Sequence, residues 1–181
     1  MEELNVRKEL MDEVISWGKT ILFALIFTLA FNRLIIVNAT VPTGSMESTI
    51  RPNDRIIANR LSYTFSPPDR YDIIVFPSPD DPTTLNVKRV IGLPGETVNI
   101  VDGRVFINDA TFALRDDFVY GGIVGNFGPF YVPYDHLFVL GDFRTNSVDS
   151  RSWENPFVQQ GSVLGRVVFR YFPGFRILRN T

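Results

Sequence analysis

Ser45 stands in the stretch VPTGSMESTIRPND, residues 41–54, directly after an apolar segment. A serine hydroxyl is a weak nucleophile until a nearby base removes its proton. The chain has one histidine, His136, and no cysteine, so thiol chemistry is excluded and a histidine base has a single candidate. A Ser45–His136 pair is one interpretation, but an ordinary, partly exposed histidine at the start of a strand is the preferred one.

Lysine is the other side chain that serves serine as a base. Three of the 18 basic residues are lysines, and Lys88 is the one that follows residue 19. A buried lysine can lose its proton, whereas an arginine such as Arg89 stays charged. Strand alternation places Lys88 on the face opposite Val87 and Arg89. To act near neutral pH, Lys88 needs its pKa lowered by about 2 to 3 pH units through burial, and a solvent-facing strand lysine is the alternative.

Two further stretches offer supporting groups. Thr43 carries a hydroxyl two residues before Ser45 and can join the Ser45 backbone N–H in binding a developing oxyanion. The stretch LGDFRTNSVDSRSW, residues 140–153, is polar and follows an apolar run. Within it, Ser147 can orient a lysine amine, and Asp149 can pair with Arg151. A turn and a polar loop that satisfy their own backbone groups are the alternatives for the two stretches.

The elements that must position these groups are mostly β-strands. Val, Ile, Phe and Tyr dominate after residue 35, with turn residues every 8 to 12 positions. Asp102-Gly103 predicts a two-residue hairpin turn. Residues 112–134 are rich in coil-forming residues and indicate an insertion, and residues 165–178 predict a closing edge strand. The predicted strands are residues 35–41, 55–59, 72–76, 86–91, 97–101, 104–108, 136–140 and 163–171.

The N-terminus predicts a membrane anchor. Residues 17–37 are apolar apart from Lys19, Asn32 and Arg33 and as a helix would be about 31 Å long, which matches a hydrocarbon core. A cleaved signal peptide ending near Ala39 and a buried or interfacial helix are the alternatives. We expect a segment 1–14 before the membrane, an anchor at 15–37 and a β domain at 38–181, with the insertion at about 110–135.

Composition narrows the function classes. A net charge of −2 argues against a nucleic-acid partner, and the single histidine and absent cysteines argue against a bound metal. We expect no cofactor.

Together, PTGSM, KRVIGLPGE and GDFRTNSVDSRSW resemble, in order and spacing, the motifs of bacterial type I signal peptidases, also called leader peptidases, which use a Ser/Lys dyad. The likeness runs from about residue 31 to residue 172. It implies a mostly β fold, a signal-peptidase-type β barrel or sheet domain with an inserted small β region, behind one transmembrane helix.

The resemblance implies a role for each matched residue. Ser45 would be the nucleophile, Lys88 the general base, and Thr43 with Ser45 the oxyanion hole. The supporting residues would be Ser147, Asp149, Arg151 and Asp142, and the walls of the substrate pockets would be Val41, Met46, Ile50 and Val87. The sequence departs from the motifs at Ser48, Phe143 and Thr145, where the family commonly has proline, asparagine, and aspartate or asparagine.

The implied activity is removal of N-terminal signal peptides from secretory preproteins at small-X-small sites. The implied partners are those preproteins and the lipid bilayer. The enzyme would be a monomer in the plasma membrane with a single span, a cytoplasmic N-terminus and an extracytoplasmic catalytic domain. Two rival functions are a self-cleaving repressor of the SOS response, which also uses a Ser/Lys dyad, and a membrane-tethered β domain that only binds partners.

Overall fold

The computed structural model describes residues 2–178, and for residues 2–6, 8 and 9 it describes the backbone alone. The chain divides into two compact units, Met1–Ile36 and Val37–Thr181. The predicted N-terminal segment and β domain each extend beyond the described residues, at Met1 and at 179–181 respectively.

The first unit is one continuous helix, α1, Glu2–Ile35. Its part Leu10–Ile35, 26 residues, is long and apolar enough to cross a membrane. Every side chain from Leu10 to Leu34 is exposed, including phenylalanines at 23 and 27. An apolar surface of this extent needs a partner other than water. The helix continues through the predicted boundary at residues 14 and 15 and ends two residues before the predicted end of the anchor.

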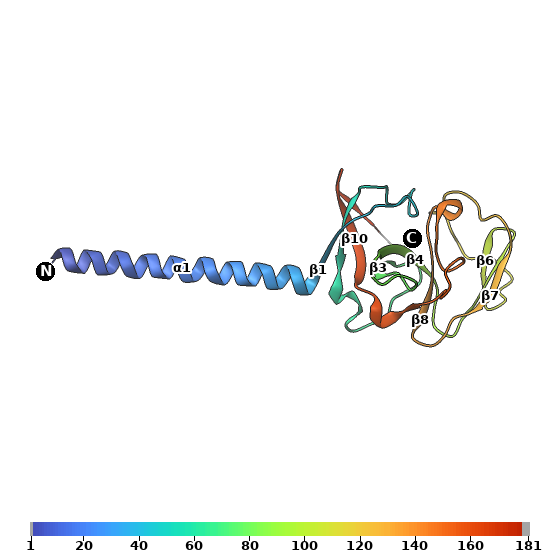
Figure 1. The fold of residues 1–181 in the computed structure, drawn as a ribbon, viewed down its shortest axis with the longest axis horizontal. Coiled ribbons are helices and arrows are strands. Elements are labelled where there is room, and N and C mark those ends of the chain that lie inside the picture. Colours follow the sequence, from blue (N-terminus) through green and yellow to red (C-terminus); the bar gives the residue numbers. More distant parts are fainter. Residues whose placement is uncertain (1, 179–181) are drawn as a thin grey trace. The chain divides into compact units, whose positions relative to one another are not determined.

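The second unit is built from strands, as predicted (Figure 1). The larger sheet has the order β1-β2-β10-β3-β4-β8-β9, with β11 paired to β10, and the smaller sheet has the order β6-β5-β7. Three short 3₁₀ helices, η1 (Arg60–Tyr63), η2 (Arg144–Asn146) and η3 (Gln160–Ser162), join the strands. The strands are β1 (Ile36–Thr40), β2 (Arg55–Asn59), β3 (Ile73–Pro77), β4 (Leu85–Gly92), β5 (Thr97–Val101), β6 (Arg104–Ile107), β7 (Phe127–Tyr131), β8 (His136–Leu140), β9 (Val158–Gln159), β10 (Gly165–Phe172) and β11 (Arg176–Ile177).

The smaller sheet takes one strand, β7, from the predicted insertion, and its other two strands, β5 and β6, come before the insertion. The hairpin between β5 and β6 turns at Asp102 and Gly103, whose φ angles of 48° and 78° fit the predicted tight turn. Residues 112–134 are coil for most of their length, but β7 lies within them and pairs with β5. The insertion therefore adds an edge strand that the composition of FGPFY does not indicate.

One strand prediction is wrong. The C-terminal strand β10 is not an edge strand, because it pairs with β2 on one side and with β3 on the other. The arginines of β10 explain the error, because charged residues in a strand indicate positions that face solvent. Arg166 lies 3.7 Å from Asp72, and Arg170 lies 3.1 Å from Asp54, so both are paired with buried carboxylates.

Strand β4 is central to the active-site region because its two faces bury different clusters. Lys88 lies opposite Ile74 and so shares a face with it, while Arg89 lies opposite Ile73 on the other face. Ile74 and Val90 belong to one buried cluster, and Ile73 belongs to another. The alternation predicted from the sequence is confirmed.

Candidate active site

The candidate active site lies where three segments meet: the turn that follows β1, strand β4 and the loop that follows β8. Ser45 sits in the turn, where the Glu47 N–H donates to the Gly44 carbonyl at 2.9 Å across Ser45 and Met46. Ser45 is 6% exposed, and Thr43 Oγ1 lies 3.3 Å from its hydroxyl oxygen. The predicted neighbours Thr43 and Ser45 are therefore in hydrogen-bond distance.

Lys88 is buried beside a hydroxyl group. It is 3% exposed, and its Nζ donates a hydrogen bond to Ser147 Oγ at 3.2 Å. Burial is the main cause that lowers the pKa of Lys88, to about 8; the Asp149 carboxylate opposes this shift, and the Arg151 guanidinium adds to it. The pKa is thus within the range that the sequence analysis required of a base.

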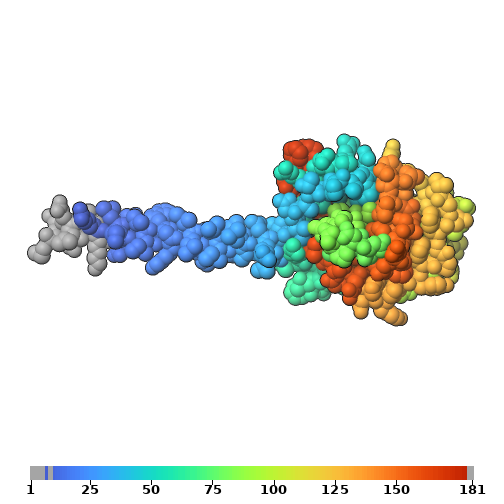
Figure 2. All heavy atoms as spheres, viewed as in Figure 1, coloured from blue at the N-terminus to red at the C-terminus, as the bar shows by residue number. Residues whose placement is uncertain are grey.

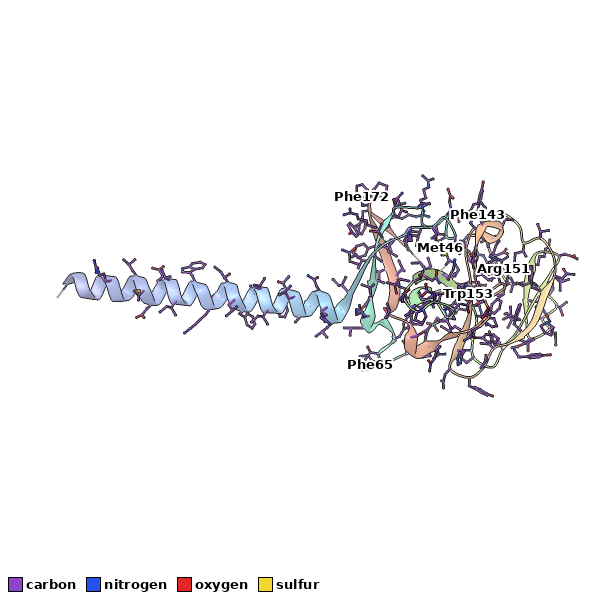
Figure 3. The ribbon with its side chains drawn as sticks, in the orientation of Figure 1. Met46, Phe65, Phe143, Arg151, Trp153 and Phe172 are labelled. Carbon is purple, nitrogen blue, oxygen red and sulfur yellow. The ribbon has the colours of Figure 1, made fainter. Side chains whose placement is uncertain are left out.

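Gly141 connects the serine turn to the loop that holds Ser147. A Cβ atom at Gly141 would clash with Ser147 Oγ and with the Ser45 carbonyl oxygen. Two residues later, the Phe143 N–H donates to that same Ser45 carbonyl at 3.0 Å. The lysine-binding serine and the candidate nucleophile are thus packed against one glycine, and Figure 3 shows Met46, Phe143 and Arg151 in this part of the body.

The predicted pair of Asp149 and Arg151 forms and holds the loop in place. Arg151 Nε lies 2.8 Å from Asp149 Oδ1, and Arg151 also donates to the carbonyls of Arg144 and Ser147, at 2.8 Å and 3.3 Å. Asp149 Oδ2 accepts from the Gly141 N–H at 3.0 Å. The pair therefore ties together both ends of the segment that contains Ser147.

Asp142 has a partner that the sequence analysis missed. Arg89 donates to both Asp142 oxygens, at 2.8 Å and 2.7 Å, and Thr49 Oγ1 donates to Oδ2 at 2.5 Å. The two charged side chains are each 1% exposed. This buried bidentate pair links β4 to the loop after β8. A signal was present, since Arg89 lies within an apolar run, but its partner lies 53 residues away.

The other candidates lie elsewhere or within the core. His136 begins β8 and makes its hydrogen bond with the Tyr134 carbonyl at 3.0 Å, about 16 Å of strand before Gly141. This position disfavours His136 as the base. The predicted pocket walls share one apolar cluster, in which Met46 and Ile50 are fully buried and Val87 is partly buried. Val41 is 2% exposed in the same cluster, so the assignment of these four as walls stays a prediction.

A family model described as "Signal peptidase, peptidase S26" matches residues 14–172. Signal peptidase I of Leptolyngbya laminosa is 39% identical, over 88% of this chain and 80% of that protein. Signal peptidase I of Rickettsia rickettsii is 32% identical, over 75% and 71%.

Thylakoidal processing peptidase 1, chloroplastic, of Arabidopsis thaliana is 30% identical, over 88% of this chain and 49% of that one. A crystal structure of a signal peptidase I from Enterococcus faecalis V583 is 38% identical, covers 55% of this chain and 95% of that one, and has a TM-score of 0.47. The chain belongs to the signal peptidase family, peptidase S26.

Proposed function

We propose that this protein removes N-terminal signal peptides from secretory preproteins, with Ser45 as nucleophile and Lys88 as general base. The observation that carries the proposal is the environment of Lys88. Its amine is buried, has a pKa lowered to about 8 and hydrogen-bonds to a serine that packs, across Gly141, against the Ser45 backbone. Family membership supplies the reaction class, and this arrangement supports Lys88 as the base.

The reaction would begin with neutral Lys88. Its amine takes the proton of the Ser45 hydroxyl, which turns from Thr43 and attacks the carbonyl carbon of the last signal-peptide residue. The resulting oxyanion is held by the Ser45 N–H and the Thr43 hydroxyl. The lysine then gives its proton to the leaving amine, and water hydrolyses the acyl-enzyme.

An extended substrate has a place to bind as an added strand. Residues 85–88 of β4 pair with β3, whereas the pairing of β4 with β8 begins at Arg89. Among the described strands, the first half of β4 therefore has one edge without a strand partner. This edge leads directly to Lys88, and backbone hydrogen bonds along it can align a peptide for attack. The surface loop before β4, green in Figure 2, is held by Asp80, which accepts from the backbone N–H groups of Glu154 and Asn155 at 3.1 Å each.

The membrane position follows from the family and from α1. A member of this family with an exposed apolar helix is membrane-associated. We extend this to a single span with a cytoplasmic N-terminus, an extracytoplasmic β body and a monomeric enzyme. Family membership and the anchor-like helix leave no support for the repressor alternative.

The first experiment compares the purified full-length protein with its Lys88→Met and Ser45→Ala variants. Each receives a preprotein whose signal ends in Ala-X-Ala, and the new N-terminus of the product is sequenced. We expect correct cleavage by the parent and none by the variants, with kcat/KM of the parent rising as the pH passes about 8. Cleavage that survives Lys88→Met would move the base elsewhere. A parent that is silent in both detergent and lipid would favour the binding-only domain.

A further inference from the structure

Residues 116–121, here called the bracing segment, lie within the coil of the insertion between β6 and β7. They contact the turn that carries Ser45 and the loop that carries Ser147, the hydrogen-bond partner of Lys88, although they supply no nucleophile or base. Their contacts reach the turn of Ser45 through Ser48 and the loop of Ser147 through Phe143 and Thr145. The inference drawn from these contacts rests on the proposed function and assigns positioning residues to it.

Tyr120 holds the catalytic loop through its backbone. Its N–H donates to the Asp142 carbonyl at 2.8 Å, and its carbonyl accepts from the Arg144 N–H at 3.0 Å. These two bonds enclose Phe143 and make a one-residue parallel bridge. On its other side, the Phe143 N–H donates to the Ser45 carbonyl. The nucleophile's own backbone is thus connected to Tyr120 through a single residue.

Gly121 packs against the same loop so closely that a side chain has no room. Its φ is +68°, a left-handed conformation that favours glycine. A Cβ there would lie 2.6 Å from Thr145 Oγ1 and 3.1 Å from Phe143 Cε2. The rings of Tyr120 and Phe143 also meet edge to face, with centroids 5.0 Å apart. The bracing segment therefore limits how far residues 143–145 can shift.

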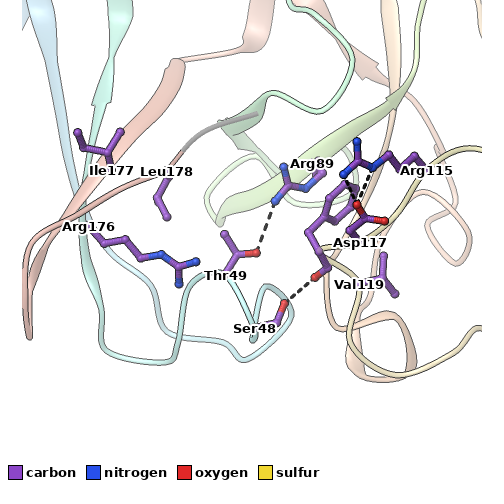
Figure 4. A pocket seen from close by; sticks show the side chains of 10 residues that line it. Ser48, Thr49, Arg89, Arg115, Asp117, Val119, Arg176, Ile177 and Leu178 are labelled. Atoms are coloured by element: carbon purple, nitrogen blue, oxygen red, sulfur yellow. Dashed lines mark hydrogen bonds and ion pairs between the residues drawn. The ribbon is translucent and has the colours of Figure 1, made fainter. Parts of the chain in front are cut away.

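Phe118 makes the corresponding contact with the serine turn. The Ser48 hydroxyl donates to the Phe118 carbonyl at 2.8 Å, at the edge of a cavity of about 600 Å³ (Figure 4). Ser48 has a φ of 99°, which proline cannot adopt. The Phe118 ring covers the guanidinium of Arg89 at 3.9 Å. Ser48, Phe143 and Thr145, the three departures from the expected motifs, thus all meet the bracing segment.

An ion pair completes the connection. Arg144 is buried, and its Nη1 has no hydrogen-bond partner in the described part of the chain. The nearest charge of opposite sign is Asp116 of the bracing segment, with Oδ2 at 3.9 Å. Arg144 Nε donates to the Gly141 carbonyl at 3.1 Å. The charge on the bracing segment is therefore directed at the arginine that holds Gly141.

We propose that the bracing segment sets the distance between Ser45 and the Lys88–Ser147 pair, with Tyr120, Gly121 and Ser48 as positioning residues. The contacts act on Ser48 in the turn of Ser45, on Phe143, whose N–H donates to the Ser45 carbonyl, and on Arg144, which donates to the Gly141 carbonyl. A displacement of the bracing segment would separate the nucleophile from its base without removing either. The expected effect is on kcat, because substrate binding along β4 does not involve these contacts.

The test compares Gly121→Ala with Gly122→Ala. Gly122 has no left-handed φ, and a Cβ added there would meet no atom within 4 Å, so it is a matched control one residue away. We expect Gly121→Ala to lower kcat by about ten- to a hundredfold with KM nearly unchanged, and Gly122→Ala to match the parent. The acidic limb of the plot of kcat against pH reports the pKa of Lys88. It should move in Gly121→Ala and not in Gly122→Ala, because Lys88 loses its fixed partner, the Ser147 hydroxyl.

A second-site variant separates positioning from general destabilisation. Adding Thr145→Ala to Gly121→Ala removes the clashing oxygen but leaves the backbone strain, so a partial recovery of kcat is expected. Near-UV circular dichroism gives the folded fraction, to which kcat is normalised. If Gly121→Ala has the normalised kcat and pH profile of Gly122→Ala, the positioning role is overturned while the proposed function stands.

If Gly121→Ala does not fold, Ser48→Ala tests the positioning role of the bracing segment instead. It keeps the same strained backbone and removes only the bond to Phe118, so a several-fold fall in kcat with unchanged KM is expected. An unchanged kcat and pH profile would overturn the proposal. A parent that does not cleave the preprotein would instead end the proposed function, and the inference with it.

Discussion

The two faces of β4 bury two adjacent basic residues, Lys88 and Arg89, beside partners of different chemistry. Lys88 is 3% exposed and its amine meets the Ser147 hydroxyl, whereas Arg89 is 1% exposed and meets the Asp142 carboxylate through two hydrogen bonds. Both side chains are buried, but their partners differ. On the lysine face the partner is a neutral hydroxyl, and burial lowers the pKa of Lys88 to about 8, whereas on the arginine face the partner is a carboxylate and the two side chains form a structural ion pair.

The largest expected effect comes from replacing Lys88 by arginine, so that both faces of β4 carry a buried arginine. Lys88→Arg places a side chain that cannot release its proton in the position of the proposed base, so kcat/KM should fall by about 10⁴-fold. Cleavage of a preprotein is measured at pH 8, with a thermal melt to verify folding. A folded variant that keeps activity within tenfold of the parent would show that Lys88 is not the base.

The next effect concerns stability on the arginine face. Arg89→Met leaves the Asp142 carboxylate buried without its cation, which should cost about 3–5 kcal/mol of unfolding free energy. Chemical denaturation measures it. Arg115→Met, which breaks an ion pair that is largely exposed, is the control and should change the stability little. Equal losses of unfolding free energy in the two variants would mean that burial of the Arg89–Asp142 pair does not determine its contribution to stability.

Removing Lys88 should stabilise the protein at low pH. Because its folded pKa lies below the unfolded value of 10.5, the folded state loses about 3 kcal/mol wherever the pH is below about 8, and this cost disappears as the pH rises to 10.5. The lost Ser147 hydrogen bond offsets about 1 kcal/mol. Lys88→Met should therefore be more stable than the parent by about 2 kcal/mol at pH 6.

Unfolding free energies of the parent and of Lys88→Met at pH 6, 8 and 10 check this prediction. The advantage of the variant should shrink between pH 8 and pH 10. A constant difference over this range would mean that Lys88 has an ordinary pKa in the folded protein.

The smallest effect comes from the hydroxyl on the lysine face. Ser147→Ala removes the hydrogen-bond partner of the Lys88 amine but leaves the proposed base in place, so kcat should fall by about tenfold. Ser147→Thr keeps a hydroxyl and should recover part of the rate. Steady-state kinetics with a signal-peptide substrate measure both. A rate unaffected by Ser147→Ala would show that packing alone orients the lysine.

The strands were the most predictable part of the molecule. β2, β5 and β8 have the bounds that alternation and turn residues predict, and the Asp102-Gly103 turn has two left-handed residues. Local sequence decides these features. β7 was missed because Gly128 and Pro129 interrupt it, and it exists through its pairing with β5. The position of β10 in the interior of the sheet depends on its pairing with β2 and β3, which lie far from it in the sequence.

The candidate site shows the same division. Lys88 was found because lysine is rare in this chain and lies in an apolar run, which are properties of the sequence itself. The partner of Asp142 and the contacts of residues 116–121 were missed because they join segments far apart in the chain, and no local pattern reports them.

Gly141 also suggests a way to separate recognition from chemistry. A methyl group there would push apart the two sides of the reaction centre while leaving both reactive side chains and the free edge of β4 intact. A Gly141→Ala protein that still folds would hold a preprotein without cutting it. Such a protein would serve as a capture reagent for the natural substrates of the enzyme, with the hydroxyl of Ser45 still in place.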